Sequence, residues 1–579
     1  MKIIYVGTNT EMHDRALAQD GDVLILSYDR WDDFGYKTRF PTICRIDGED
    51  IELGAVRILF EGQSASHPFL TGLRENGWDR EFPVLEANYV SVPEDVTFYE
   101  QLMDLLPTAS AMEVAIALRD ASHLSHVAQD PEALALIDTE GFRTSLLRER
   151  AAKRSFAEGY KILGGEALEV GDLSFDFLDV DDDLSTLHLN FSPRSPLPHD
   201  INVIIGSNGV GKSSLLRQMI RTWIQPDERH PDLEGARFDT RPNLSQLVAV
   251  SYSPFERFPV DADDEPSLSK PLKDKDIYRF FGFRGRLPSQ KTGRQSSIRN
   301  SLAVPKANAC RSLIQCLADD RRFGTIKAWA NKLTTLQRVL GSGIAFDVAA
   351  VKLQAGTDIE EIVPEDPFGE FQAIEWAEGD DDQPDVYVPI ETGNTTIDTD
   401  LLLRRVDLED GVTFFKDGEP LKLSSGQRLF FYIVVNVLGV IRRNSLVIVD
   451  EPELFLHPTL EIQFVSMLKD ILRTYGSKAL LATHSVVTVR EVPSRCVHVL
   501  ERTDDGLKIT TPPFETFGGD VQRISSYVFG DRSVSKPHDE WLEKLLQQYE
   551  TADAVIEALG GDLNEEMIIQ LNAMERGQW

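Results

Sequence analysis

The sequence predicts an α/β protein with a mostly parallel core sheet around a phosphate-binding loop, joined to a separate N-terminal α/β or α+β domain. Three observations carry this prediction. The apolar run Ile201 to Ile205 leads into a glycine-rich loop and then into the apolar helical segment Leu215 to Ile220. Two later apolar runs, Ser445 to Asp450 and Lys478 to Thr483, have the length and composition of buried parallel strands. A chain of 579 residues with 42% hydrophobic residues can also bury several cores.

The loop Gly206-Ser-Asn-Gly-Val-Gly-Lys-Ser213 stands in the strand, loop and helix context that phosphate-binding loops require. Backbone N–H groups of such a loop converge on nucleotide phosphates. Lys212 is expected to reach the β and γ phosphates, and the Ser213 hydroxyl to complete a Mg²⁺ shell. The candidate nucleotide-binding residues of this segment are Gly206, Asn208, Gly209, Gly211, Lys212, Ser213 and Ser214. We therefore expect the chain to bind ATP or GTP.

Two further strands are expected to bring acidic and imidazole side chains to the same sheet edge. Asp450 and Glu451 end the first of them, and His484 follows the second. Asp450 would join Ser213 as a Mg²⁺ ligand, and Glu451 would polarise the attacking water as a general base. A lone histidine is usually structural, but one at this position is better interpreted as a γ-phosphate contact.

The chain divides into three predicted parts: an N-terminal domain over 1–165, a nucleotide-binding domain over 166–510, and a C-terminal helical tail over 511–579. In the first part, short apolar runs predict strands at Ile3 to Val6, Asp22 to Ser27, Thr42 to Ile46 and Ala55 to Phe60, and periodic segments predict helices at Tyr99 to Leu106, Met112 to Leu118 and Phe142 to Ala157. Residues Trp31 to Tyr36 are either a partner-binding loop or an ordinary turn, and the turn is the simpler interpretation. The tail helices either pack on the core or dock a neighbour.

In the second part, alternating residues at Leu173 to Leu178 and Thr186 to Phe191 predict a small antiparallel sheet before the phosphate loop. The run Leu247 to Ser253 predicts another core strand. A long insertion, about 256–420, is expected to form a helical lid. Its segment Lys273 to Arg311 combines cations with aromatic side chains, which suits nucleic acid, although a lid that packs its aromatics inward is the simpler interpretation. The acidic segment Glu360 to Asp385 is expected to be a solvated loop rather than a metal site.

Composition limits the classes of function. A formal net charge of −34 argues against a chain that coats nucleic acid non-specifically along its whole surface. There is no apolar run of eighteen residues and no signal peptide pattern, so we expect a cytoplasmic protein without a membrane span. The spacing of Cys44, Cys310, Cys316 and Cys496 indicates buried free thiols rather than a zinc site.

Taken together, the motifs resemble those of the ABC-type ATPases. Gly206 to Ser213 matches their Walker A motif, Leu423-Ser-Ser-Gly-Gln427 their signature, Leu446 to Pro452 their Walker B motif, and Ala482 to Ser485 their switch histidine. The resemblance covers roughly 166–510 and implies ATP and Mg²⁺ as cofactors. It also implies a head-to-tail dimer in which signature residues of one subunit meet the ATP held by Lys212 of the other. Those signature residues would be Ser424, Ser425, Gly426 and Gln427.

This chain departs from the family pattern at two points. The glutamine expected after the strand Leu247 to Tyr252 is absent, so Ser251 or Ser253 would have to take its place. Ser425 also stands where transporters usually carry glycine.

The segment Glu451 to Pro458 resembles the soluble SMC/OLD-like branch of these ATPases, including AAA family ATPases of bacterial antiphage systems such as Septu and the retron-associated systems. The sequence has no heptad arms like those of chromosome ATPases, and we expect no Toprim nuclease after the ATPase motifs. We therefore expect an ATP-gated dimeric switch or clamp that senses or binds nucleic acid and controls a separate effector, such as a nuclease, in antiviral defence. The alternatives are an ATPase-regulated, nuclease-like enzyme with its catalytic site in the N-terminal domain, a DNA-repair ATPase, and a transporter ATP-binding subunit.

Overall fold

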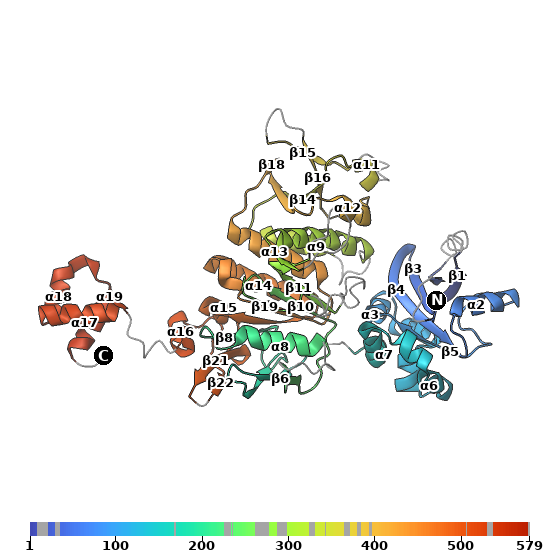
Figure 1. Ribbon diagram of the computed structural model, residues 1–579, viewed down its shortest axis with the longest axis horizontal. Helices are drawn as coiled ribbons and strands as arrows, with labels where there is room; N and C mark the ends of the chain where they lie inside the picture. Colours follow the sequence, from blue (N-terminus) through green and yellow to red (C-terminus); the bar gives the residue numbers. More distant parts are fainter. Residues whose placement is uncertain are drawn as a thin grey trace.

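The computed structural model describes most of the chain. The described residues are 1–8, 21–28, 35–166, 170–224, 233, 235–260, 277–286, 298–323, 331–341, 343–363, 371–378, 384–392, 396–504, 506–529 and 537–576. The predicted loop residues 31–34, much of the basic segment 273–311 and the acidic residues 379–383 lie outside these ranges. Figure 1 shows the N-terminal domain at one side, the nucleotide-binding domain in the centre and the C-terminal helices at the other side.

A seven-stranded sheet forms the centre of the nucleotide-binding domain. Its order is β11-β10-β19-β20-β8-β21-β22, and all neighbours pair in parallel except β21 and β22. The strands are β8 (Ile201–Gly206), β10 (Gln246–Ser251), β11 (Tyr278–Gly282), β19 (Ser445–Asp450), β20 (Lys478–Thr483), β21 (Val497–Thr503) and β22 (Gly506–Thr510). The predicted α/β fold with a mostly parallel sheet and a phosphate-binding loop is thus confirmed.

Helices cover both faces of this sheet, which is why its strands are continuous apolar runs. Every residue of β8 is buried, and its side chains alternate between two cores: Val203 and Ile205 belong to one, Ile204 to the other. Figure 1 shows α8 below the sheet, with α13, α14 and α9 above it. These helices are α8 (Lys212–Ile224), α9 (Ala303–Arg322), α13 (Ser425–Val440) and α14 (Pro458–Thr474).

The predicted antiparallel hairpin precedes the phosphate loop. Strands β6 (Leu173–Leu178) and β7 (Leu184–Leu189) pair in antiparallel fashion, and the short β9 (Arg237–Phe238) adds to the free edge of β6. The hairpin packs Phe175, Phe177 and Leu187 into the core that also contains Leu215 of α8. The alternation seen in the sequence is therefore the alternation of a half-buried sheet.

The lid insertion is not purely helical, so that part of the prediction is wrong. It contains a five-stranded antiparallel sheet of order β15-β16-β14-β17-β18. Its strands are β14 (Val348–Lys352), β15 (Ile374–Trp376), β16 (Asp385–Pro389), β17 (Val412–Lys416) and β18 (Glu419–Pro420). Its other described elements are β12 (Arg284–Gly285), β13 (Arg299–Asn300), α9, α10 (Lys332–Gly341), α11 (Ile359–Ile362) and α12 (Thr399–Arg405). Strands this short leave no periodic signal that sequence inspection can separate from loops.

In the basic segment, the aromatic side chains face inward. Tyr278, Phe280 and Phe281 lie on the core strand β11 and are at most 7% exposed. Arg284 is paired with the buried carboxylate of Glu256, with 2.9 Å between Nε and Oε1. The inward-packed interpretation therefore holds for these described aromatics, which are not available for stacking on bases.

The N-terminal domain is a five-stranded mixed sheet covered by helices. Only β1 and β2 of its order β1-β2-β3-β4-β5 run parallel. The strands are β1 (Lys2–Gly7), β2 (Val23–Ser27), β3 (Arg39–Ile46), β4 (Glu49–Phe60) and β5 (Tyr89–Pro93). The helices are α2 (Ser66–Glu75), α3 (Thr97–Leu105), α4 (Thr108–Ala117), α5 (Ala121–His123), η1 (Leu124–Ala128), α6 (Pro131–Ile137), η2 (Phe142–Leu146) and α7 (Arg150–Leu163). The predicted strands are all present, whereas α2 and β5 were not foreseen.

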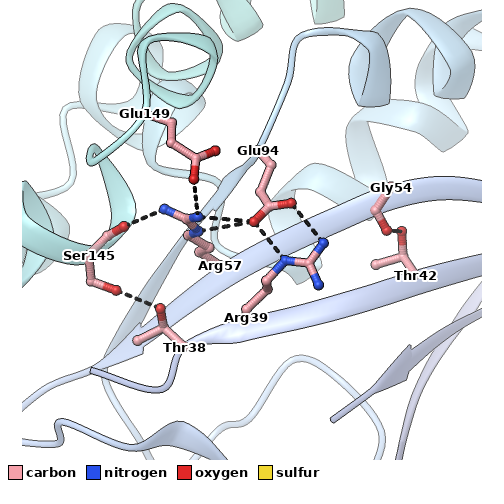
Figure 2. A network of polar contacts seen from close by, with 8 residues as sticks. All are labelled: Thr38, Arg39, Thr42, Gly54, Arg57, Glu94, Ser145 and Glu149. Atoms are coloured by element: carbon pink, nitrogen blue, oxygen red, sulfur yellow. Dashed lines mark hydrogen bonds and ion pairs between the residues drawn. The ribbon is translucent and has the colours of Figure 1, made fainter. Parts of the chain in front are cut away.

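A buried ion network ties this sheet to its helices (Figure 2). Arg57 of β4 is 1% exposed, and its guanidinium donates to Glu94, to the carbonyl of Ser145 and to Glu149. Glu94 also accepts two hydrogen bonds from Arg39, at 2.8 and 3.1 Å. Because each group has its partner, the network holds β4, the end of β5 and the start of α7 in one arrangement.

The N-terminal domain contacts the nucleotide-binding domain through α3 and through Asp95, two residues before that helix. Arg442 and Arg443, which follow α13, form ion pairs with Asp95 and Asp104 at 2.9 and 3.1 Å. Glu100 of α3 lies buried near Arg443. The end of α13 is therefore fastened to the N-terminal domain.

The C-terminal tail is helical, as predicted, and divides into two parts. Helix α16 (Val521–Phe529) packs Ile524 and Val528 into the core of the nucleotide-binding domain. The helices α17 (Pro537–Tyr549), α18 (Ala552–Leu559) and α19 (Glu565–Glu575) share a core of their own around Leu542, Val555 and Leu571. Packing on the core of the nucleotide-binding domain thus describes α16 and not the last three helices. The remaining short elements are η4 (Pro452–Phe455), α15 (Val486–Arg490), η5 (Ser494–Cys496) and η6 (Gly560–Asp562).

All four cysteines are buried and free, as the sequence predicted. Within the described ranges, no helix combines the length and the apolar character needed to cross a bilayer. Nor do the described side chains include a group of three or more His, Cys, Asp or Glu placed to hold a metal ion.

Candidate functional site

The strand register brings the predicted motifs to one edge of the central sheet. Ser251 at the end of β10 stands opposite Asp450 at the end of β19, and Asp450 stands opposite Ala482 of β20. Thr483 stands opposite Ile205, one residue before the phosphate loop. Parallel strands all present their carboxyl ends at the same edge, so segments separated by more than two hundred residues meet there.

The phosphate loop needs its glycines for two different physical reasons. Gly209 and Gly211 have φ of 79° and 100°, in the left-handed region that side chains disfavour. Gly206 is needed for close approach, because a Cβ there would lie 2.3 Å from the carbonyl oxygen of Leu500. Helix α8 begins at Lys212, so its free N–H groups and its dipole point to the loop. Asn208 and Gly209 are exposed, and Ser214 is half-buried.

Lys212 is buried and held inside the loop that it serves. Its Nζ donates to the carbonyl oxygens of Gly206 and Ser207 at 2.9 and 3.2 Å, and it lies 2.9 Å from Nε2 of His484. Burial lowers the pKa of Lys212 to about 8, while Glu451 and Asp450 act in the opposite direction. The ammonium group is thus mostly protonated at neutral pH and is poorly solvated, which suits it to bind phosphate.

Asp450 and Ser213 form the pair predicted to hold a cation. The Ser213 hydroxyl donates to Oδ1 of Asp450 at 3.2 Å. Burial raises the pKa of Asp450 to about 7, and the hydrogen bond from Ser213 counters this only in part. A hydroxyl and a carboxylate are the hard oxygen donors that Mg²⁺ prefers, so the residues fit the expected metal.

Glu451 is held in a strained backbone conformation. Its φ of 52° and ψ of 54° are left-handed, and its N–H donates to the carbonyl of Ala482 at 2.8 Å. Such a conformation costs about 1–3 kcal/mol in a non-glycine residue and is found most often at functional sites. Oε1 of Glu451 lies 3.8 Å from Nε2 of His484. The strain therefore places this carboxylate beside the predicted γ-phosphate contact.

His484 occupies the turn between β20 and α15. Burial lowers its pKa, and the Lys212 ammonium lowers it further. Its backbone N–H donates to Oε1 of Glu453 at 2.6 Å, and Ser485 beside it donates its hydroxyl to Glu461. The imidazole is thus neutral at neutral pH, and its backbone is fixed by neighbouring carboxylates.

The signature residues stand at the free N-terminus of α13. Ser424 is the N-cap: its hydroxyl accepts from the N–H of Gln427, and the Gln427 side chain accepts from the N–H of Ser424. Ser424 and Ser425 are exposed, whereas Gly426 packs against the carbonyl of Phe455. The helix start is well formed and faces solvent in the single chain.

Ser251, offered with Ser253 in place of the missing glutamine, is 1% exposed and adjoins Asp450, so it is the better placed of the two. With Tyr252, Asp450 and Glu451 it lines a small cavity beside the strand end. Glu453 was missed altogether, although its place three residues after Asp450 was a signal that the same turn would bring it to the site.

The fold and this site define the class: the domain is an α/β P-loop NTPase fold with a mixed sheet, and it carries an additional N-terminal domain. Residues 272–490 match the family model described as "AAA domain, putative AbiEii toxin, Type IV TA system". This range contains Ser424, Asp450 and His484 and begins after the phosphate loop. The chain is also similar to protein ea59 of Escherichia phage lambda, with 24% identity over 564 residues, 95% of this chain and 94% of that protein.

Solved structures give weaker likenesses. The SMC head domain from Thermotoga maritima is 10% identical, with a TM-score of 0.24, over 60% of this chain and 100% of that one. A putative metal-chelate type ABC transporter in an inward-facing conformation is 14% identical, with a TM-score of 0.26, over 62% of this chain and 89% of that one.

Proposed function

We propose that the protein is an ATP hydrolase that works as an ATP-gated dimer and controls a separate effector in antiviral defence. The convergence of four side chains at one sheet edge is the observation that carries this proposal. Nζ of Lys212 lies 2.9 Å from Nε2 of His484, and the same nitrogen lies 3.8 Å from Oε1 of Glu451. Asp450 ends β19, the strand that pairs with β20, and β20 leads to His484. A phosphate-binding cation, a candidate base and a metal ligand are thus within reach of one triphosphate.

Each group has a distinct task in the proposed reaction. Lys212 would exchange its contacts with the loop carbonyls for contacts with the β and γ phosphates. Ser213 and Asp450 would hold Mg²⁺, which offsets phosphate charge when it is bound. Glu451 would accept the proton of the attacking water, and His484 would contact the γ-phosphate.

A second copy of the chain would complete this site. Ser424 and Ser425 at the N-terminus of α13 are exposed, and a helix N-terminus attracts phosphate. Exposed apolar side chains lie on the segments that flank the site: Phe255 is 87% exposed, Leu454 45% and Phe455 43%. Such side chains favour a protein interface. ATP would therefore hold two subunits together, and hydrolysis would release them.

The N-terminal domain offers a route from this cycle to an effector. Arg442 and Arg443 follow the same helix that begins with the signature, and they pair with Asp95 and Asp104. A shift of α13 on closure would thus reach α3 of the N-terminal domain. Nucleic acid remains the proposed trigger, bound by cations of the segment 273–311 rather than by its buried aromatics.

The test is the solution mass of Glu451→Gln with and without ATP and Mg²⁺. The substitution keeps the shape of the side chain and removes the base, so the closed dimer should accumulate and the mass should double. The double variant Glu451→Gln with Lys212→Ala is the matched control and should remain a monomer, because it cannot hold the phosphates. An unchanged mass in the single variant that nevertheless binds ATP would refute the ATP-gated dimer.

A further inference from the structure

We infer that Glu453 is a positioning residue for His484, and that its turn connects the signature of a subunit to that subunit's own ATP site. The inference rests on the proposed ATP hydrolysis and adds a residue to it. Glu453 lies in the short 3-10 turn η4, directly after the left-handed Glu451. Neither the motifs nor the comparisons assign it a task.

The contact with His484 is specific. Oε1 of Glu453 accepts the backbone N–H of His484 at 2.6 Å, a short charge-assisted hydrogen bond. Its other oxygen, Oε2, is buried; burial raises the pKa of this carboxyl, and hydrogen bonds from His484, from Thr483 and from its own backbone lower it. A buried carboxylate is costly unless hydrogen bonds compensate, so the contact with His484 helps to hold Glu453 in this place.

The same turn packs against the signature. A Cβ on Gly426 would lie 2.8 Å from the carbonyl oxygen of Phe455, the last residue of η4. Gly426 therefore lets the start of α13 rest directly on the turn that carries Glu453. Backbone touches backbone at this point, so little movement can be absorbed between the two elements.

A continuous path thus runs through one subunit. It leads from Gly426 to the turn η4, from Glu453 to the backbone of His484, and from the imidazole to Lys212. In the proposed dimer the signature meets the partner's ATP. When the signature binds the partner's ATP, η4 would shift and bring His484 into contact with the γ-phosphate of the subunit's own ATP. The two sites of the dimer would therefore hydrolyse ATP together.

Two substitutions separate positioning from a charge effect. Glu453→Gln keeps the length of the side chain and an oxygen acceptor for the His484 N–H, but it removes the charge. Glu453→Asp keeps the charge but is one methylene too short to reach that N–H. If Glu453 positions His484, Glu453→Gln should retain at least a third of the ATPase kcat and Glu453→Asp should lose tenfold or more. KM for ATP should stay within threefold in both.

His484→Ala completes a double-mutant cycle. Because Glu453 acts through His484, adding Glu453→Asp to His484→Ala should change kcat by less than twofold. Asp470→Asn, an acid-to-amide change on the exposed face of α14, is the matched control and should keep full activity.

The outcomes are distinguishable. The positioning role would be overturned if Glu453→Asp were active and Glu453→Gln inactive. It would also be overturned if the kcat losses of Glu453→Asp and His484→Ala multiplied in the double variant. In both cases the proposed ATP hydrolysis would still stand. A wild-type chain that binds ATP without hydrolysing it, alone or as a dimer, would overturn the proposed function itself and this inference with it.

Discussion

Replacing Glu100 with glutamine should stabilise the protein at alkaline pH. Glu100 lies on α3, at the contact between the two domains, and is 9% exposed. Burial raises the pKa of its carboxyl from 4.5 to about 7, with Arg443 opposing the shift and Asp95 adding to it. The folded protein therefore holds this proton more tightly than the unfolded chain does, and the native state is penalised when the proton is lost.

The size and the sign follow from linkage. As the pH rises from 4.5 through about 7, the unfolded chain ionises first, and stability falls across that window. Above it, the full penalty is about 3 kcal/mol, since a pKa difference of one costs about 1.4 kcal/mol. At pH 5 the penalty is below about 1 kcal/mol. Glutamine has no proton to lose, so Glu100→Gln should gain about 2 kcal/mol over wild type between pH 5 and pH 8.

Urea unfolding at pH 5 and at pH 8 measures this difference. The exposed Glu113 on α4 gives the matched control, because Glu113→Gln makes the same acid-to-amide change outside the buried domain contact. A difference between Glu100→Gln and wild type that is the same at both pH values would refute the reasoning, because it would mean that Glu100 ionises as readily in the folded protein as in the unfolded chain.

Two further ion pairs give predictions of different size. The pair of Arg442 and Asp95 is partly exposed, so a double-mutant cycle with alanine should give a coupling of only about 1 kcal/mol in urea unfolding, falling with added salt; a coupling above about 3 kcal/mol would contradict this. Lys332 is buried against Asp319 at 2.7 Å, with side chains 5% and 17% exposed. Asp319→Ala should cost about 3 kcal/mol because it leaves a buried cation unpaired, while adding Lys332→Met should recover most of that loss; a double variant as unstable as Asp319→Ala would show that packing, not charge, dominates there.

The meeting of the candidate site residues at one sheet edge could be predicted because each segment that carries them is local in sequence. The loop at Gly206, the strand end at Asp450 and the turn at His484 each follow an apolar run, and parallel strands present their ends at one edge. The residues that hold the site are less visible. The role inferred for Glu453 can be seen only in the folded chain, where η4 places its carboxylate at the backbone N–H of His484, 31 residues away in the sequence.

The prediction of a helical lid was wrong for a different physical reason. Val348–Lys352 pairs with Val412–Lys416 across some sixty residues of intervening chain, and each strand has five residues. Such pairing is a property of the tertiary fold and leaves little local pattern. The aromatics Tyr278, Phe280 and Phe281 show the same limit, since only the structure reveals that they lie on a buried strand rather than on a binding face.

Helix α13 is the element on which these features meet. Ser424 caps its first turn, Gly426 rests on the turn of Glu453, and Arg442 follows its last turn on the side of the N-terminal domain. The helix has 16 residues, about 24 Å, and most of its side chains are buried, so it moves as one body. A displacement at the exposed signature would therefore act on His484 at one end and on the N-terminal domain at the other. In the function proposed above, this one rigid helix would make ATP hydrolysis and effector control respond to the same event.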